Sequence, residues 1–111
     1  MLNRDSILKA KDLKTIDLEV KEWGGTIKLQ TMTGHDRQEY YKTTASKDGP
    51  KNVMEALIIA CAVDDKGEPI FTSADLKELS KKSAIAISRV FESAAELNGL
   101  TQKAVDDIAG E

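Results

Sequence analysis

A glycine pair between two alternating segments is the feature that most constrains the fold of this chain. Gly24 and Gly25 follow Trp23, and residues 16–22 and 26–30 alternate between apolar and polar side chains. Two adjacent glycines supply the positive φ angles of a tight hairpin turn. Alternation is typical of a half-buried strand. The pattern therefore predicts an antiparallel hairpin, whose apolar face must pack against the rest of the chain because an isolated hairpin is marginally stable.

The register of this hairpin follows if the two glycines form the whole loop. Trp23 then pairs with Thr26, and Val20 pairs with Leu29. One face carries only apolar side chains, which are Ile16, Leu18, Val20, Ile27 and Leu29. Trp23 lies at the tip on the polar face, where an aromatic side chain is a candidate partner contact. In the alternative interpretation, Trp23 folds over a neighbouring loop or helix, or a bulge at a glycine turns it inward, and it only packs.

Length and charge limit the classes of protein to consider. The 111 residues predict a single domain, 1–111, and 41% of them are hydrophobic. Sixteen basic and 19 acidic residues give a net charge of −3, which argues against a nucleic-acid binder. No apolar run approaches the ~20 residues of a membrane span, and residues 1–11 lack the apolar core of a signal peptide. The only cysteine, Cys61, lies in an apolar run and is expected to be a buried thiol in a reducing cytosol.

Helix signals surround the hairpin on both sides. Asn3 or Asp5 is expected to cap a short helix that ends near residue 11. Thr33, with Asp36 three residues later, resembles a capping box that opens a helix to about residue 44. Residues 72–75 form a similar box before a helix through Leu79. Apolar residues at three- and four-residue spacing predict a longer helix that ends at about residue 97, with Asn98 and Gly99 as its C-cap and a last short helix, carrying Val105 and Ile108, after it.

The run from Ala56 to Val63 is apolar on all sides. Periodicity cannot decide between a buried helix and a buried strand for such a run. The residues upstream favour a helix over about 51–63, which would form the centre of the core. The predicted fold class is therefore α+β, with an N-terminal β-hairpin packed on four to five mostly C-terminal helices.

We find no pattern that carries catalysis or binds a cofactor or a metal. The single histidine, His35, has no cysteine nearby and lies in a capping segment. Catalytic histidines need an orienting partner, and metal sites need several convergent ligands. Read as a calcium loop from Asp64, the chain has Lys66 and Pro69 where a ligand and a glycine are required. Phosphate-binding glycine motifs are absent. We therefore predict a protein that is not an enzyme and that acts by binding a partner.

Aromatic and small side chains mark the candidate binding surfaces. Trp23, Tyr40 and Tyr41 are the predicted protein-binding residues, because aromatic residues are enriched where proteins bind each other. Two adjacent tyrosines on a helix point about 100° apart, so at least one is expected to be exposed. The outer edge of the hairpin could accept a further strand. Alanines and serines between residues 84 and 95 would allow close contacts between copies, although such residues serve equally well inside a monomer.

The order of these features resembles the tail assembly chaperones of siphovirus-type bacteriophages and their prophages. The resemblance covers nearly the whole chain and rests on loose motifs whose order and separation are the specific part. They are Asp5-Ser6-Ile7-Leu8-Lys9-Ala10, Trp23-Gly24-Gly25 with Ile27 and Leu29, Met32-Thr33-Gly34, Asp64-Asp65 with Gly67 and Pro69-Ile70-Phe71, Asp75-Leu76 with Leu79, and Leu97-Asn98-Gly99-Leu100.

This resemblance implies a function and a set of partners. Proteins of this family are small α+β domains that coat the tape measure protein, keep it soluble and are displaced as tail tube subunits polymerise around it. They act in the host cytoplasm and are absent from the mature virion. A frameshifted longer form is thought to recruit the tail tube protein, and the present chain would correspond to the short form. Because many copies must line one filament, we also expect self-association, through the C-terminal helices. A small cytoplasmic adaptor or regulatory module that binds a host protein is the alternative.

Overall fold

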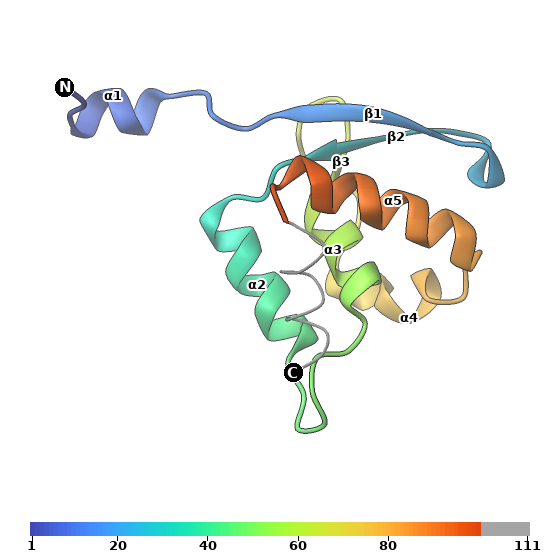
Figure 1. Ribbon diagram of the computed structural model, residues 1–111. Helices are drawn as coiled ribbons and strands as arrows, with labels where there is room; N and C mark the ends of the chain where they lie inside the picture. Colours follow the sequence, from blue (N-terminus) through green and yellow to red (C-terminus); the bar gives the residue numbers. More distant parts are fainter. Residues whose placement is uncertain (101–111) are drawn as a thin grey trace.

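The computed structural model describes residues 1–100 and places a small antiparallel sheet over a layer of helices (Figure 1). The strand order is β1-β2-β3. In chain order the elements are α1 (Arg4–Lys9), β1 (Thr15–Val20), the 3₁₀ turn η1 (Lys21–Trp23), β2 (Gly25–Gln30), α2 (Gly34–Thr44), α3 (Val53–Cys61), β3 (Ala62–Val63), the 3₁₀ turn η2 (Ser73–Asp75), α4 (Leu76–Leu79) and α5 (Ala84–Leu97). The predicted α+β class is confirmed.

The hairpin is present, but its predicted register is wrong. Leu18 pairs with Ile27, and Val20 pairs with Gly25, so the loop holds four residues and not two. Residues 21–23 form a 3₁₀ turn that Gly24 closes at a φ of 74°, its N–H donating to the carbonyl of Lys21. The turn brings Trp23 against the core, which a two-residue loop would not do. The partner of Val20 shifts by four residues, from Leu29 to Gly25, and because this number is even the apolar side chains still share one face, as predicted.

The apolar run after residue 55 divides between two elements. Helix α3 ends at Cys61, and the next two residues form β3, which pairs antiparallel with β2. Ala62 lies opposite Leu29, so the run continues the core from helix into sheet. The expected central helix is confirmed, whereas the third strand was not predicted, because an apolar run has the same appearance in either conformation.

Helices α3 and α5 and strand β2 enclose the core. The largest fully buried side chains are Val20, Leu29, Leu57, Ile58, Cys61 and Val90. The predicted periodicity of α5 is confirmed at Ile87, Val90, Phe91 and Ala94, which are buried where the helix packs against α3 and β1, whereas Ala84 is exposed. Its small residues Ala86, Ala94 and Ala95 are buried in the same core. These alanines therefore pack inside the monomer and do not offer a contact between copies.

Capping side chains set the helix ends as the sequence indicated. Thr33 and Asp36 form a reciprocal capping box at α2, and Thr72 and Asp75 form another at η2. Gly99 adopts the left-handed conformation expected after α5, with a φ of 69°. The predicted last helix, with Val105 and Ile108, lies outside the described residues.

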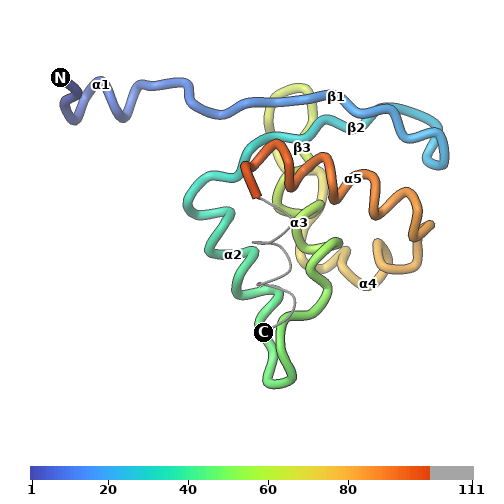
Figure 2. The backbone as a smooth tube through the Cα atoms, in the orientation of Figure 1, coloured from blue at the N-terminus to red at the C-terminus, as the bar shows by residue number. Residues whose placement is uncertain are grey.

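Residues 1–14, which we call the arm, extend away from the body of the molecule (Figure 2). Every arm residue is exposed, and α1 within it has no buried residue. The arm leads directly into β1, whose other end carries the hairpin turn, so the arm and the turn lie at opposite ends of the sheet (Figure 1). This extension accounts for much of the long dimension of the molecule, 46 Å against 36 and 26 Å in the other directions.

Candidate partner-binding surface

A groove of roughly 470 Å³, the tip groove, lies between the hairpin turn and α4. Three apolar side chains line it: Trp23 from η1, Phe71 from the loop before η2, and Leu79 from α4. Trp23 and Phe71 are half-buried and pack against the hydrophobic core, and Leu79 belongs to that core. The expectation that Trp23 lies on the polar face is therefore wrong, because its ring turns toward the helices. Its role as a partner contact stays a prediction, since the ring lines an open groove.

Charged side chains surround these apolar residues. The rim of the tip groove is formed by Glu22, Asp75, Glu78 and Lys82, three acids and one base. An apolar floor with a mainly acidic rim suits an amphipathic segment that carries basic residues. No spacing pattern in the sequence connects Phe71 and Leu79 to Trp23, although Leu79 was expected to lie in a helix.

An ion pair fixes the hairpin turn over α5. Arg89 donates two hydrogen bonds to the Glu22 carboxylate, at 2.7 and 3.1 Å. This bidentate arrangement is the strong geometry for a guanidinium and a carboxylate. The hydrogen bonds from Arg89 lower the pKa of Glu22 from its usual value. The pair links residues 67 positions apart and holds one wall of the tip groove in place.

The two tyrosines occupy different environments. Tyr40 is only 3% exposed and belongs to the core, and burial raises the pKa of its phenol to about 12. Tyr41 is 45% exposed. The expectation that at least one tyrosine is exposed is confirmed. Their rings lie 5.7 Å apart at a tilted angle. Tyr40 thus lies beneath the surface, and only Tyr41 of the pair offers an open face to a partner.

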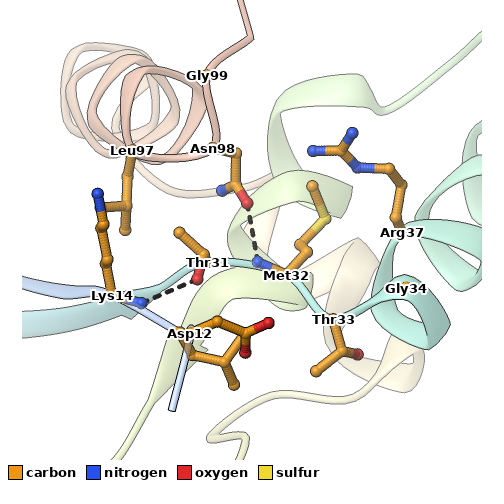
Figure 3. Close-up of a pocket in the computed structure, with 11 residues that line it drawn as sticks. Asp12, Lys14, Thr31, Met32, Thr33, Gly34, Arg37, Leu97, Asn98 and Gly99 are labelled. Atoms are coloured by element: carbon orange, nitrogen blue, oxygen red, sulfur yellow. Dashed lines mark hydrogen bonds between the residues drawn. The ribbon is translucent and has the colours of Figure 1, made fainter. Parts of the chain in front are cut away.

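A second, more polar pocket lies where the arm joins the body, between residues 12–14, residues 31–34 and the end of α5 (Figure 3). The backbone N–H of Lys14 donates to the Thr31 hydroxyl at 3.0 Å, and that of Met32 donates to the Asn98 side chain at 2.8 Å. Asn98 also donates to the carbonyl of Ala94. The first hydrogen bond joins the arm to the segment after β2, and the second joins that segment to the end of α5, so we interpret the pocket as a structural junction.

Side chains that could bind a metal or take part in catalysis are dispersed in the described part of the chain. Among residues 1–100, no three His, Cys, Asp or Glu side chains lie together as metal ligands would. His35 is exposed on the first turn of α2. Cys61 is buried as predicted, and burial raises the pKa of its thiol to about 11. Over the same residues, no helix has the length and apolar character needed to cross a membrane.

Comparison with known proteins identifies a similar fold. No known protein family matches the sequence, and no curated protein matches it either. The structure is similar to that of the tail assembly chaperone of bacteriophage HK97, with a TM-score of 0.60. The match covers 84% of this chain and 90% of that protein, at 18% sequence identity. The fold is therefore similar to that of this phage chaperone, in agreement with the coarse expectation from the sequence.

Proposed function

We propose that this protein is a bacteriophage tail assembly chaperone that binds the tape measure protein and keeps it soluble until the tail tube forms. The observation that carries the proposal is the similarity of fold to the HK97 chaperone over 84% of this chain. The motif order in the sequence is a second, independent line of support. Fold alone does not determine function, and the exposed apolar surface supplies the physical basis for a binding role.

The proposed mechanism follows from the surface of the molecule. A tape measure protein is a long helical chain whose apolar stripes would aggregate before the tube covers them. Apolar surface such as the tip groove would cover a stripe, and the net charge of −3 would keep the complex in solution. Tail tube subunits would then displace the chaperone. On this proposal the protein acts in the host cytoplasm and is absent from the mature virion.

Co-expression with the tape measure protein encoded downstream in the same genome tests the proposal. We expect the tape measure protein to move from the pellet to the soluble fraction and to co-purify with the chaperone. Trp23→Ala should weaken capture while the free protein keeps its helical circular dichroism. Ile85→Ala is the control, because Ile85 is 70% exposed on α5 and lies outside the tip groove.

A co-expression experiment in which no complex forms would change the functional assignment. If the tape measure protein stays insoluble and forms no complex with the folded chaperone, the proposed function is wrong. An adaptor that binds a host protein would then be the remaining hypothesis. Loss of capture in Ile85→Ala but not in Trp23→Ala would keep the function and move the binding site to α5.

A further inference from the structure

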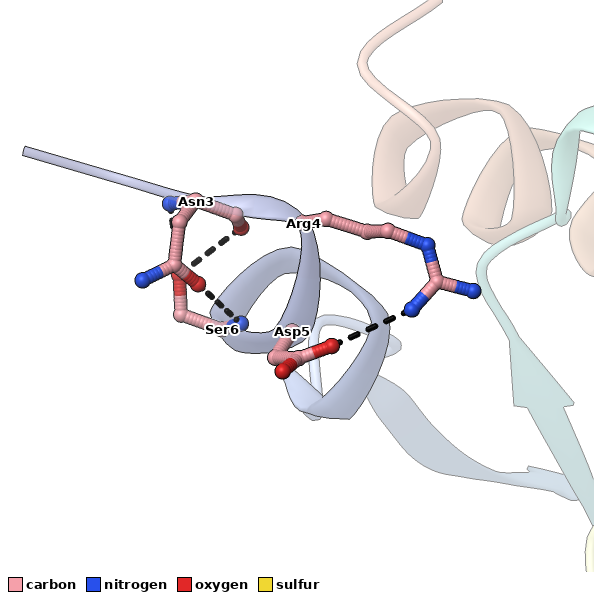
Figure 4. Close-up of polar contacts among 4 residues, drawn as sticks. All are labelled: Asn3, Arg4, Asp5 and Ser6. Atoms are coloured by element: carbon pink, nitrogen blue, oxygen red, sulfur yellow. Dashed lines mark hydrogen bonds and ion pairs between the residues drawn. The ribbon is translucent and has the colours of Figure 1, made fainter.

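The arm is held to the body at its base, where Lys14 and Thr31 exchange hydrogen bonds. Helix α1 lies beyond this base and stabilises its own start, with the Asn3 side chain accepting from the Ser6 N–H at 2.9 Å (Figure 4). None of the residues of α1 is buried. The direction of the arm therefore depends on what contacts its base, residues 12–14.

The base of the arm forms one wall of the polar pocket of Figure 3, which we call the junction pocket. This pocket measures roughly 600 Å³, and its other walls are the segment from β2 into α2 and the end of α5. Each wall contributes one apolar side chain, namely Leu13, Met32 and Leu97. Leu13 is 42% exposed, so the pocket presents apolar surface that the described part of the chain leaves open.

The charged residues of the junction pocket are mainly basic. Lys14 and Arg37 line it together with one acid, Asp12. Neither base has an ion-pair partner in the described part of the chain. The groove between α2 and α3 has the opposite character, since Asp36 and Glu39 line it without a base. The junction pocket therefore suits a segment that carries both apolar and acidic side chains, whereas the groove between α2 and α3 does not.

Residues 101–111, which we call the C-terminal segment, have this composition. Three acids and one base give the segment a side-chain charge of −2. Val105 and Ile108 are three positions apart, so they share a face in the helix that the sequence predicts there. Asp106 and Asp107 lie between them in the sequence. An apolar pair flanked by acids thus matches a pocket whose apolar walls are flanked by bases.

The C-terminal segment also starts at the edge of the junction pocket, because Gly99 lines this pocket and Leu100 follows it. The N–H groups of Gly99 and Leu100 donate to the carbonyls of Glu96 and Ala95, at 3.0 and 2.9 Å, an arrangement that reverses the chain at the end of a helix. In a helix, Ile108 lies roughly 12 Å beyond Leu100. The tip groove lies near the far end of α5, whose 14 residues span about 21 Å. The junction pocket is thus the nearer of the two sites.

We propose that the C-terminal segment docks in the junction pocket of its own chain and thereby holds the arm against the body. Val105 and Ile108 pack on the apolar walls around Leu13, and the two acids between them face the two bases of the pocket. The segment then contacts the arm, the start of α2 and the end of α5 together, which fixes the direction of the arm. This contact lies within one molecule and does not depend on the proposed function.

A nitroxide at the end of the C-terminal segment tests where the segment lies. Glu111→Cys supplies the attachment site in the full-length chain, since the natural Cys61 is buried. At low concentration, we expect the nitroxide to broaden the N–H signals of Lys14 and Gly34 and to leave that of Trp23 sharp. In a mixture of ¹⁵N-labelled protein without nitroxide and unlabelled protein with nitroxide, every signal should stay sharp, because the contact is within one chain.

A charge on the apolar face tests whether that face is buried. Ile108→Asp should speed amide hydrogen exchange at residues 104–107 at least about tenfold, as expected when one buried aliphatic contact is lost. Gln102→Asp is the matched control, because it adds the same charge to the same segment outside the apolar pair. This control should exchange at the rate of the wild type.

Reversal of charge on both sides tests the complementarity. Lys14→Glu combined with Arg37→Glu should speed exchange in the C-terminal segment as Ile108→Asp does. Adding Asp106→Lys and Asp107→Lys to that protein should restore slow exchange, provided that circular dichroism shows both proteins to be folded. If the pocket variant does not fold, the nitroxide and Ile108→Asp experiments decide the question, since neither changes a residue of the pocket.

Four outcomes would overturn the proposal. One is broadening at Glu39 and Thr43, in the groove between α2 and α3, in place of the junction pocket. Broadening of the pocket signals in the mixed sample would place the contact between two molecules. Equal exchange rates in Ile108→Asp and Gln102→Asp would mean that the apolar face is not buried, and folded charge-reversed proteins that do not restore slow exchange would exclude the ionic contacts. None of these measurements involves the tape measure protein, so this proposal and the proposed function can fail separately.

Discussion

Helices α1 and α2 begin in the same way and end in different environments. Each opens with a reciprocal capping box, Asn3 with Ser6 in α1 and Thr33 with Asp36 in α2. Helix α2 buries Tyr40 and Thr44 in the core, whereas α1 buries nothing. A cap determines where a helix starts, but only an apolar partner surface makes the helix contribute to the stability of the fold. The body of this protein supplies that surface for α2 and not for α1.

The largest expected difference between body and arm concerns leucine truncation. Leu57 lies on α3 and is fully buried in the core. Leu57→Ala should therefore lower the free energy of unfolding by about 2–5 kcal/mol. Leu8 is 66% exposed, and Leu8→Ala should change the free energy of unfolding by less than about 0.5 kcal/mol. Urea denaturation at low protein concentration, where self-association is negligible, measures both. A large loss in Leu8→Ala under those conditions would show that the arm belongs to the folding unit.

The junction between arm and body should give the next largest effect. Asn98 accepts a hydrogen bond from the Met32 N–H and donates to the carbonyl of Ala94, both at 2.8 Å. Asn98→Ala leaves a part-buried N–H without its partner, which costs about 1–3 kcal/mol. Glu96→Ala, an exposed change on the last turn of α5, should be nearly neutral. Equal urea midpoints for these two variants would contradict the structural role that we assign to Asn98.

Paired cap substitutions compare α1 and α2 directly. Thr33→Ala should lower the free energy of unfolding by about 1 kcal/mol, because it removes the side-chain acceptor at the start of a helix that packs in the core. Asn3→Ala removes the same kind of acceptor from α1 and should leave the urea midpoint unchanged, while the arm loses helical content. Amide hydrogen exchange of residues 4–9 reports that local loss. A shared decrease in both midpoints would mean that the two helices unfold together.

Local signals in the sequence predicted local structure well. The capping boxes, the glycine after α5 and the periodicity of α5 involve residues within a few positions of each other, so the sequence displays them directly. The hairpin register failed because Trp23 packs against distant helices, and this contact selects a four-residue turn. β3 was missed because Ala62 and Val63 continue an apolar run that a helix would also explain.

The candidate site was predictable only in part. Trp23 could be chosen from the sequence because it is the sole tryptophan and follows a strand pattern. Its groove partners Phe71 and Leu79 lie about 50 residues away, and no spacing rule connects them to it. The burial of Tyr40 and the exposure of Tyr41 could not be distinguished from sequence, since the two are adjacent and identical. The free arm was not predicted either, because its apolar residues have the spacing of a helix that packs.

The smallest expected effect concerns the link between the hairpin turn and α5. The folded-state pKa of Glu22 is lowered because Arg89 donates to its carboxylate, so the pair contributes stability above the unfolded pKa, near 4.5. That contribution is lost as the pH falls through the lowered folded value. Arg89→Gln should return the pKa of Glu22 toward 4.5, as measured by carboxyl NMR titration. High salt should have the same effect in the wild type, because exposed ion pairs are screened.

A second charge removal shows whether this effect belongs to the Arg89 contact or to surface charge in general. Lys81 pairs with Glu78 at 3.3 Å on the opposite wall of the tip groove and does not contact Glu22. Lys81→Gln should therefore leave the Glu22 titration where it is. Equal shifts in Arg89→Gln and Lys81→Gln would mean that the overall field, and not the bidentate contact, lowers the pKa. In that case the contact between Arg89 and Glu22 would contribute little to holding the hairpin turn over α5.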